Sequence, residues 1–269
     1  MAGNQALQVN PPDAQEHVST NGSDWLWAAF SIQGFALLAT FVAFVARPRG
    51  TRLFHNIALV VMATSTVAYF SMASDLGATP IETEFRTATT RQIWYVRYIQ
   101  WFINWPLLVL SCLLATGLSL SDILTTMFMS VLVVVAWLVG ALVHTSYKWG
   151  YFVFGLVALI FVWFQLLVHA PQTNFASPTT ISKPYWLGAA YLFFILLTYP
   201  ICWGCSEGGN VITVTSEMIW YGILDICIGP GFFLLYFLNL RKIDYAAFGF
   251  QSGKWVEGAP VASSEKPRV

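Results

Sequence analysis

The side chains of this chain best suited to chemistry are a few ionisable groups placed inside long apolar segments. Asp225 occurs in the run ILDICIGPGF, Arg97 in RYIQWFINWPLL and Glu217 in SEMIWYG, with Glu207 nearer the end of a segment. A charged side chain is costly to bury in a membrane and usually faces a partner or a water-filled cavity. We expect Arg97 and Asp225 to form an interior ion pair, which either joins two helices or lines a water-containing cavity.

The segment that contains Arg97 also has one polar face. Its polar residues follow at i, i+3, i+7 and i+14, which places them on one helical stripe: Arg97, Gln100, Asn104 and Ser111. Pro106 in the same segment frees a backbone carbonyl one turn earlier. Three aromatic residues, Trp101, Tyr199 and Trp203, are expected at the depth of Asp225, although such residues are most often packing.

Other kinds of chemistry find little support. The sequence has no phosphate-binding glycine loop, no metal-spaced histidine set and no nucleophile paired with a base, so we expect neither an enzyme nor a metal site. Its formal net charge is zero and its basic residues are scattered, which argues against a nucleic-acid partner.

These side chains must be positioned by membrane helices. The chain is 57% hydrophobic and 10% charged, with a mean hydropathy of +0.63, and a helix needs about 20 mostly apolar residues to cross a bilayer. Seven segments meet that length: 24–46, 53–77, 93–116, 120–144, 149–170, 184–206 and 211–240. Because the connections are short, we predict one all-α bundle of seven transmembrane helices in the lipid bilayer.

The distribution of Lys and Arg over the short loops predicts the direction of insertion. The excess of basic residues places the N-terminus outside and the C-terminus inside. Residues 1–23 are then an extracellular polar tail, 24–245 the membrane domain and 246–269 a disordered cytoplasmic tail. Asn21 begins the sequence Asn21-Gly22-Ser23, a candidate glycosylation site close to the first helix.

The run RYIQWFINWPLL resembles the third helix of microbial rhodopsins, TYPICWG their sixth and SEMIWYGILDICIGPGF their seventh; the GGN turn and the YGILD run are similar to the fungal branch. That resemblance implies seven helices around retinal, held as a Schiff base by a lysine four residues after the aspartate that matches Asp225. Gly229 occupies that lysine position. A Schiff base needs a side-chain amine, and the remaining lysines lie at helix ends or in loops, so we expect no covalent retinal.

The resemblance also implies that the two proton-carrying carboxylates of the pumps are replaced by Gln100 and Ser111, which cannot carry protons near neutral pH. The scaffold is kept. The expected remnant of the retinal pocket, which could hold a ligand, comprises Tyr69, Trp101, Asn104, Pro106, Tyr199, Pro200, Trp203, Asp225 and Gly229. The expected internal polar network comprises Arg97, Gln100, Glu207, Glu217 and Asp225.

Three functions follow as hypotheses. The chain is similar to lysine-less fungal opsin-related proteins, which implies a stress-related or regulatory role at the plasma membrane through membrane partners such as a proton-pumping ATPase, with homo-oligomers as a further option. A second hypothesis is a receptor or carrier that holds a retinoid or sterol without a covalent bond, since Gly229 leaves room beside Asp225. The third is a passive ion path along the polar stripe, opposed by the apolar inner half of the third helix.

Overall fold

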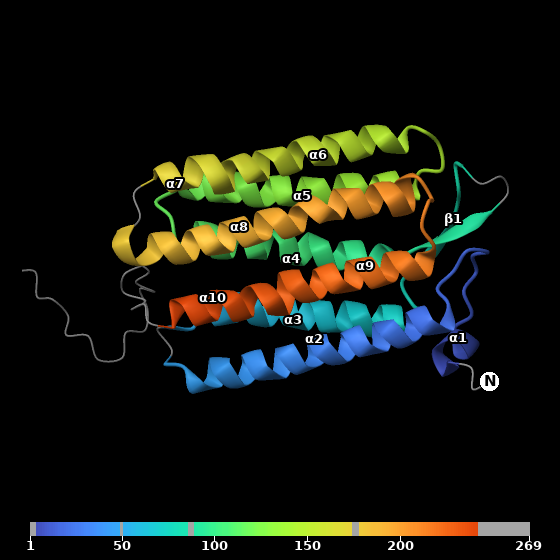
Figure 1. Cartoon of the computed structure of the whole chain (residues 1–269), viewed down its shortest axis with the longest axis horizontal. Helices are drawn as coiled ribbons and strands as arrows, with labels where there is room; N and C mark the ends of the chain where they lie inside the picture. Colours follow the sequence, from blue (N-terminus) through green and yellow to red (C-terminus); the bar gives the residue numbers. More distant parts are fainter. Residues whose placement is uncertain (1–3, 49–50, 86–88, 174–177, 242–269) are drawn as a thin grey trace, which may run out of the picture.

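The computed structural model describes residues 4–48, 51–85, 89–173 and 178–241. In this part of the chain, long helices run side by side, and a small hairpin covers one end of them (Figure 1). We call this the hairpin end of the bundle, and the opposite one the far end. The C-terminal tail predicted at 246–269, and the last residues of the predicted membrane domain, lie outside the described residues.

The helices agree closely with the apolar segments of the sequence. The first four are α2 (Thr20–Ala46), α3 (Leu53–Ala73), α4 (Tyr95–Leu113) and α5 (Leu120–Leu142). The next rod combines α6 (Lys148–Phe164), the π-helical turn η2 (Gln165–His169) and α7 (Ala170–Gln172). The sixth joins α8 (Pro178–Trp203) to η3 (Gly204–Gly208), and the seventh joins α9 (Val214–Ile226), η4 (Cys227–Gly231) and α10 (Phe232–Leu240).

Six of these rods are long and apolar enough to cross a membrane, and α4 is not among them. The exception has a simple cause, because α4 carries the polar stripe that includes Arg97, Gln100 and Asn104. Its polar face is nevertheless buried inside the bundle. The helix therefore packs as the seventh member of the bundle while its composition is the least apolar.

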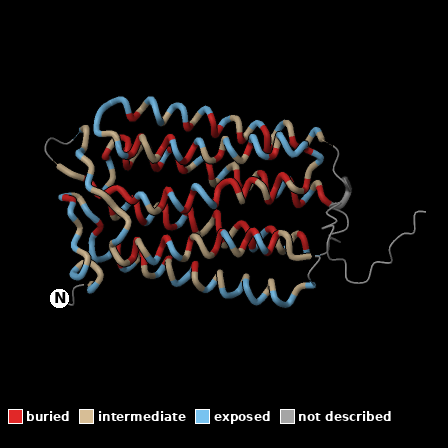
Figure 2. Tube along the Cα trace, turned by 180° about the vertical axis from the view of Figure 1, so that it is seen from behind, coloured by how far each residue is buried: buried red, intermediate tan, exposed pale blue. Residues whose placement is uncertain are grey.

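The rods form a closed ring in which each contacts the next along the chain, and α2 closes the ring against α9. Buried residues concentrate on the sides that face the centre, while the outward sides are exposed (Figure 2). Many of those exposed residues are large and apolar, such as Phe35 and Leu38 on α2. A bundle that is apolar both inside and outside suits a lipid environment.

Residues 4–19, part of the predicted polar tail, are ordered against the bundle. They include a short helix, α1 (Gln5–Val9), and the buried side chains of Ala14 and Val18. Glu16 exchanges backbone hydrogen bonds with strand β2 (Thr90–Ile93), which itself pairs antiparallel with β1 (Thr79–Glu82). The segment thus belongs to the folded cap, and α2 begins at Thr20 rather than at residue 24 because Ser19 caps its first turn.

The seventh rod widens into a π-helical turn at η4, where Pro230 lies inside the helix. Proline has no N–H to donate, so a backbone carbonyl about one turn earlier loses its usual partner. Side chains from neighbouring helices contact carbonyls of this turn: Gln33 Nε2 lies 3.4 Å from the Asp225 carbonyl, and the Tyr191 hydroxyl donates at 2.9 Å to the Cys227 carbonyl, which also accepts from the Phe232 N–H. The wide turn is therefore fixed by tertiary contacts, and it sits directly beside Asp225.

Candidate functional site: the interior polar network

Asp225 lies in the centre of the bundle with 1% of its surface exposed. Four neutral donors converge on its carboxylate. Oδ1 accepts from Tyr199 Oη at 2.7 Å and from Trp101 Nε1 at 3.0 Å, while Oδ2 accepts from Tyr69 Oη at 2.8 Å and from Gln100 Nε2 at 3.3 Å. Donors aimed at a carboxylate stabilise its charged form, so this arrangement can hold a buried carboxylate without a neighbouring amine.

The expected ion pair between Arg97 and Asp225 is wrong. Arg97 Nη2 instead makes its closest contact with Glu217 Oε1, and a longer one of 3.4 Å with Glu207 Oε1. Glu217 lies eight residues before Asp225 on the same helix, which is about 12 Å nearer the hairpin end. Because neutral donors already occupy both oxygens of Asp225, the guanidinium turns toward the two glutamates.

A second arginine, Arg91, lies between the predicted segments 53–77 and 93–116 and completes this ion cluster. Arg91 on β2 is 1% exposed, and its Nη2 donates to Glu217 Oε2 at 2.6 Å. Its Nη1 donates to the Ile212 carbonyl at 2.7 Å and lies 3.6 Å from Glu16 Oε2. No helical spacing links a strand residue to Glu217, so no sequence signal could have identified this contact.

Glu207, in η3, is the second carboxylate of the cluster and is 3% exposed. Its Oε1 accepts from the Tyr98 hydroxyl at 2.9 Å, and its Oε2 is in hydrogen-bond contact with Ser206 and lies 3.3 Å from the Tyr221 hydroxyl. The Arg97 guanidinium also lies 4.1 Å from the centre of the Tyr221 ring, a cation–π contact. The cluster thus joins α4, β2, η3 and α9 through fully buried charges.

Aromatic rings fill the space next to Asp225. Trp101 packs edge to face on Tyr199 with the ring centres 5.1 Å apart, and Trp105 contacts both rings at 5.6 and 5.0 Å. Trp203, which we expected at the same depth, packs elsewhere: its Nε1 donates to the Trp137 carbonyl at 3.2 Å. The retained aromatics therefore divide into one group around Asp225 and one nearer the hairpin end, because Trp203 lies one turn further along α8.

The position of Gly229 is closely approached by neighbouring side chains. A Cβ placed there would lie 3.4 Å from Met62 Cε and 3.8 Å from Gln33 Oε1, which is ordinary contact distance. Of the lysines that the structure describes, Lys148 is at the hairpin end, 3.2 Å from Glu84, and Lys183 is exposed on α8. Within this part of the chain, neither amine reaches Asp225, so the residues present do not fit a retinal bound as a Schiff base.

The rest of the polar stripe on α4 is used in helix contacts. The Asn104 amide donates to Ser65 Oγ at 2.9 Å, and Gln100 Nε2 contacts the same oxygen at 3.3 Å. Ser111 turns back on its own helix and donates to the Leu107 carbonyl at 2.9 Å. Pro106 and Pro200 are buried in the packed interior. The polar stripe therefore connects α4 to α3 through Gln100 and Asn104. It does not continue as a polar path beyond Asn104.

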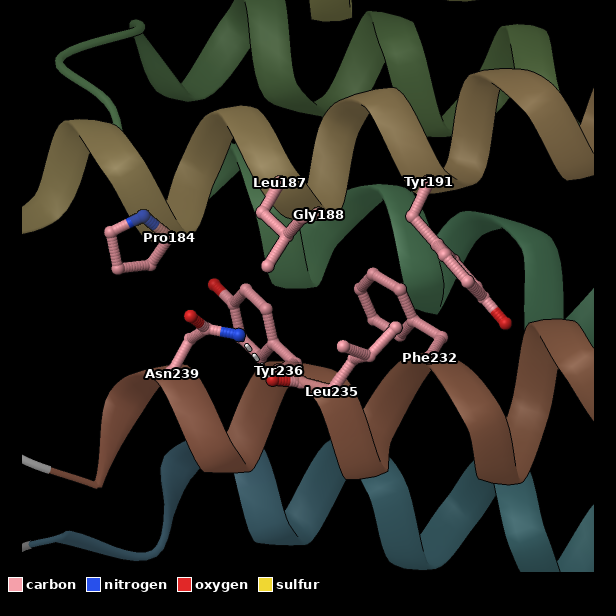
Figure 3. A pocket seen from close by; sticks show the side chains of 8 residues that line it. All are labelled: Pro184, Leu187, Gly188, Tyr191, Phe232, Leu235, Tyr236 and Asn239. Atoms are coloured by element: carbon pink, nitrogen blue, oxygen red, sulfur yellow. Dashed lines mark hydrogen bonds between the residues drawn. The ribbon is translucent and has the colours of Figure 1, made fainter.

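A small pocket opens between α8 and α10, lined by residues that include Gly188, Tyr191, Phe232 and Tyr236 (Figure 3). The space in it that is open to a water-sized sphere is about 10 Å³, which suits about one water molecule. This pocket cannot hold a retinoid or a sterol in the described conformation.

Asn21 is exposed in the first turn of α2, but Gly22 and Ser23 are buried. The Ser23 hydroxyl accepts a hydrogen bond from the Asn4 amide at 2.7 Å. The folded protein therefore shows the asparagine of the sequon on its surface and covers the serine. Modification at Asn21 stays a prediction.

Comparison with known proteins agrees with this arrangement. Residues 20–242 match the family model described as bacteriorhodopsin-like protein. The chain is 60% identical over 260 residues to protein FDD123 of Trametes versicolor, covering 97% of this chain and 92% of that protein. It is 34% identical to the 30 kDa heat shock protein of Saccharomyces cerevisiae, covering 84% of this chain and 74% of that one.

Solved structures show the same fold. The light-driven proton pump of Coccomyxa subellipsoidea superposes with a TM-score of 0.79 at 30% identity, covering 83% of this chain and 98% of that one. The light-driven proton pump of Leptosphaeria maculans superposes with a TM-score of 0.76 at 29% identity, over 85% and 99% of the two chains. By its sequence, its bundle and its buried polar network, this chain is a multi-pass membrane protein of the bacteriorhodopsin-like family.

Proposed function

We propose that this protein is an opsin scaffold that works without a covalent chromophore and without light-driven pumping. The observation that carries the proposal is the surroundings of Gly229 and Asp225. No amine of the described residues reaches Asp225, and four neutral donors satisfy its carboxylate. At the two positions that resemble the proton carriers of pumps, Gln100 and Ser111 act as hydrogen-bond donors to fixed neighbours.

This proposal includes the finer topology. All seven rods, α4 among them, cross the plasma membrane, with the N-terminus outside and the C-terminus inside. The excess of Lys and Arg on the far-end loops supports that direction. The interior ion cluster supports α4 as a crossing helix, because its charges are paired inside the bundle rather than exposed to lipid.

The test is reconstitution with all-trans retinal. We expect the purified protein to give no red-shifted visible band and no product that borohydride fixes to the chain. A matched control variant, Gly229→Lys, restores the amine at the family position. A red-shifted, borohydride-sensitive band in the unsubstituted protein would refute the proposal directly.

The cellular role proposed with this scaffold is regulatory and non-enzymatic: the protein acts in stress through membrane partners, of which a plasma-membrane proton ATPase is the first candidate. A relative named as a 30 kDa heat shock protein supports the connection with stress. In cells that lack the protein, we expect altered proton-ATPase activity after heat stress, restored by the intact chain. Equal ATPase activity with and without the protein, before and after stress, would contradict this role.

The second candidate, a carrier of a small apolar ligand bound without a covalent bond, keeps one supporting observation: Gln33 Oε1 and Gln100 Oε1 are buried acceptors without a donor in the described structure. The close packing of Trp101, Trp105 and Tyr199 opposes it. If Trp101→Ala left the binding of every retinoid and sterol unchanged, the carrier hypothesis would fail. The third hypothesis, a passive ion path, is tested by measuring proton flux into liposomes that contain the protein. We expect this flux to equal that of empty vesicles.

A further inference from the structure

Residues 4–19 form a strap at the hairpin end of the bundle (Figure 1). A few discrete contacts dock the strap there. The Asn10 side-chain amide donates to the Ser74 carbonyl at 2.8 Å, and Glu16 exchanges backbone hydrogen bonds of 2.8 and 2.9 Å with strand β2. Val18, near the end of the strap, is completely buried. Because few contacts hold the strap, a change at one of them alters how often it opens.

The Gln92 side chain connects the strap to Asp75. Its amide oxygen accepts from the Val18 N–H at 3.0 Å, and its amide nitrogen donates to Asp75 Oδ1 at 2.7 Å. Asp75 lies in the turn after α3, outside the membrane-crossing rod, with a φ of 57°. Aspartate and asparagine tolerate this left-handed conformation better than most other side chains. The Val18 amide and the Asp75 carboxyl are therefore the two ends of one hydrogen-bonded chain.

The other oxygen of Asp75 is poorly satisfied. Oδ2 is buried and has no hydrogen-bond partner among the described residues. Burial raises the pKa of the Asp75 carboxyl above its usual range; the Gln92 donor and the charge of His17 act against this rise, and the charge of Asp13 adds to it. Asp13 and His17 belong to the strap, and Asn10 of the strap binds the carbonyl just before Asp75. The docked strap therefore helps to create the surroundings that favour a neutral carboxyl.

Proton binding at Asp75 and docking of the strap are linked. A released strap leaves the carboxyl with more water and without Asp13, so its charged form becomes less costly. Protonation accordingly favours the docked strap, and this advantage is lost as the pH rises through the raised pKa of the docked state. We propose that Asp75 makes the strap pH-sensitive, docked most firmly in acid and released more often toward alkaline pH. Release also removes Glu16 from its place 3.6 Å from Arg91, so the pH at the hairpin end acts on the interior ion cluster.

The experiment follows the Val18 amide, which donates to Gln92 only while the strap is docked. Hydrogen exchange of the full-length protein in phosphatidylcholine nanodiscs is measured by NMR between pH 4 and pH 8. The protection factor of Val18 is divided by that of the variant Asp75→Asn, which keeps a neutral side chain at every pH and tolerates the same φ. This ratio cancels the effects of all other titrating groups. We expect the ratio to fall as the pH rises, by at most about tenfold per pH unit because one proton is involved, and then to become constant.

A matched variant and two adverse outcomes complete the test. Asp24 is exposed and also accepts a hydrogen bond from the strap, from Asn4 at 3.1 Å, so Asp24→Asn is expected to keep the pH dependence of the unsubstituted chain. A ratio that does not change with pH would overturn the proposal, as would a pH dependence that survives Asp75→Asn and disappears in His17→Gln. If Val18 exchanges only as slowly as the core amides of α3 at every pH, the strap does not open separately and the proposal is wrong.

Discussion

Replacing Glu217 by glutamine tests the buried ion cluster most directly. This one carboxylate is shared by Arg97 and Arg91, and all three side chains are at most 1% exposed. Breaking a buried ion pair by removal of one partner costs about 3–5 kcal/mol. Since Arg97 keeps Glu207 at 3.4 Å and Arg91 keeps Glu16 at 3.6 Å, we expect the lower value, about 3 kcal/mol.

For a domain of this size, 1 kcal/mol changes the melting temperature by roughly 2–4 °C, so Glu217→Gln is expected to lower it by roughly 6–12 °C. The assay is thermal unfolding in phosphatidylcholine nanodiscs, followed by circular dichroism. Asp122→Asn is the matched control, because the same chemical change at a helix start costs about 1 kcal/mol or less. If Glu217→Gln and Asp122→Asn have the same melting temperature, the shared carboxylate does not stabilise the cluster and the reasoning is refuted.

Two matched pairs test the packing around Asp225 by the same melting assay. Gly229→Ala is expected to leave the free energy of unfolding unchanged or to raise it by up to about 1 kcal/mol, because the added Cβ would lie 3.4 Å from a side-chain carbon, an ordinary contact distance. Gly222→Ala is expected to lower it by about 1–3 kcal/mol, because the added Cβ would lie only 2.5 Å from an indole nitrogen. Equal melting of the two variants would show that the interior is looser than described. Tyr69→Phe removes a hydrogen-bond donor to the Asp225 carboxylate and is expected to lower the free energy of unfolding by about 1.5–3 kcal/mol. Tyr191→Phe removes a donor to a neutral backbone carbonyl, so the expected loss is smaller, about 0.5–1.5 kcal/mol. A larger loss for Tyr191→Phe would indicate that Asp225 is not held as a charged group.

Much of the architecture was predictable because membrane helices are a local property of sequence. About 20 apolar residues in a row form a helix in lipid whatever their neighbours are, since every backbone group must be satisfied within the segment. The predicted segment 120–144, for example, is α5 at Leu120–Leu142. The glycine at position 229, where the family has a lysine, can likewise be identified from the sequence without a structure.

The predictions that failed depended on contacts between segments. The stripe on α4 correctly placed Arg97 in the interior, but it could not select Glu217 over Asp225, because that choice depends on the axial level of α9 and on the donors already around each carboxylate. The N-terminal segment was predicted only as a polar tail, and its composition gave no sign of a folded cap. Its backbone is ordered by pairing of Glu16 with a strand some 75 residues away, which composition does not encode.

By itself, then, the sequence determined the approximate positions of the helices, most of the interior charges and the loss of the lysine at Gly229. The tertiary structure decided which charges meet, because pairing follows from the rotation and level of whole helices rather than from spacing within one. It also decided that Met62 and Gln33 lie against Gly229, and that Arg91 on a strand reaches the same carboxylate as Arg97 on a helix. Such contacts arise only when distant segments pack, and the polar network at the centre of this protein consists of them.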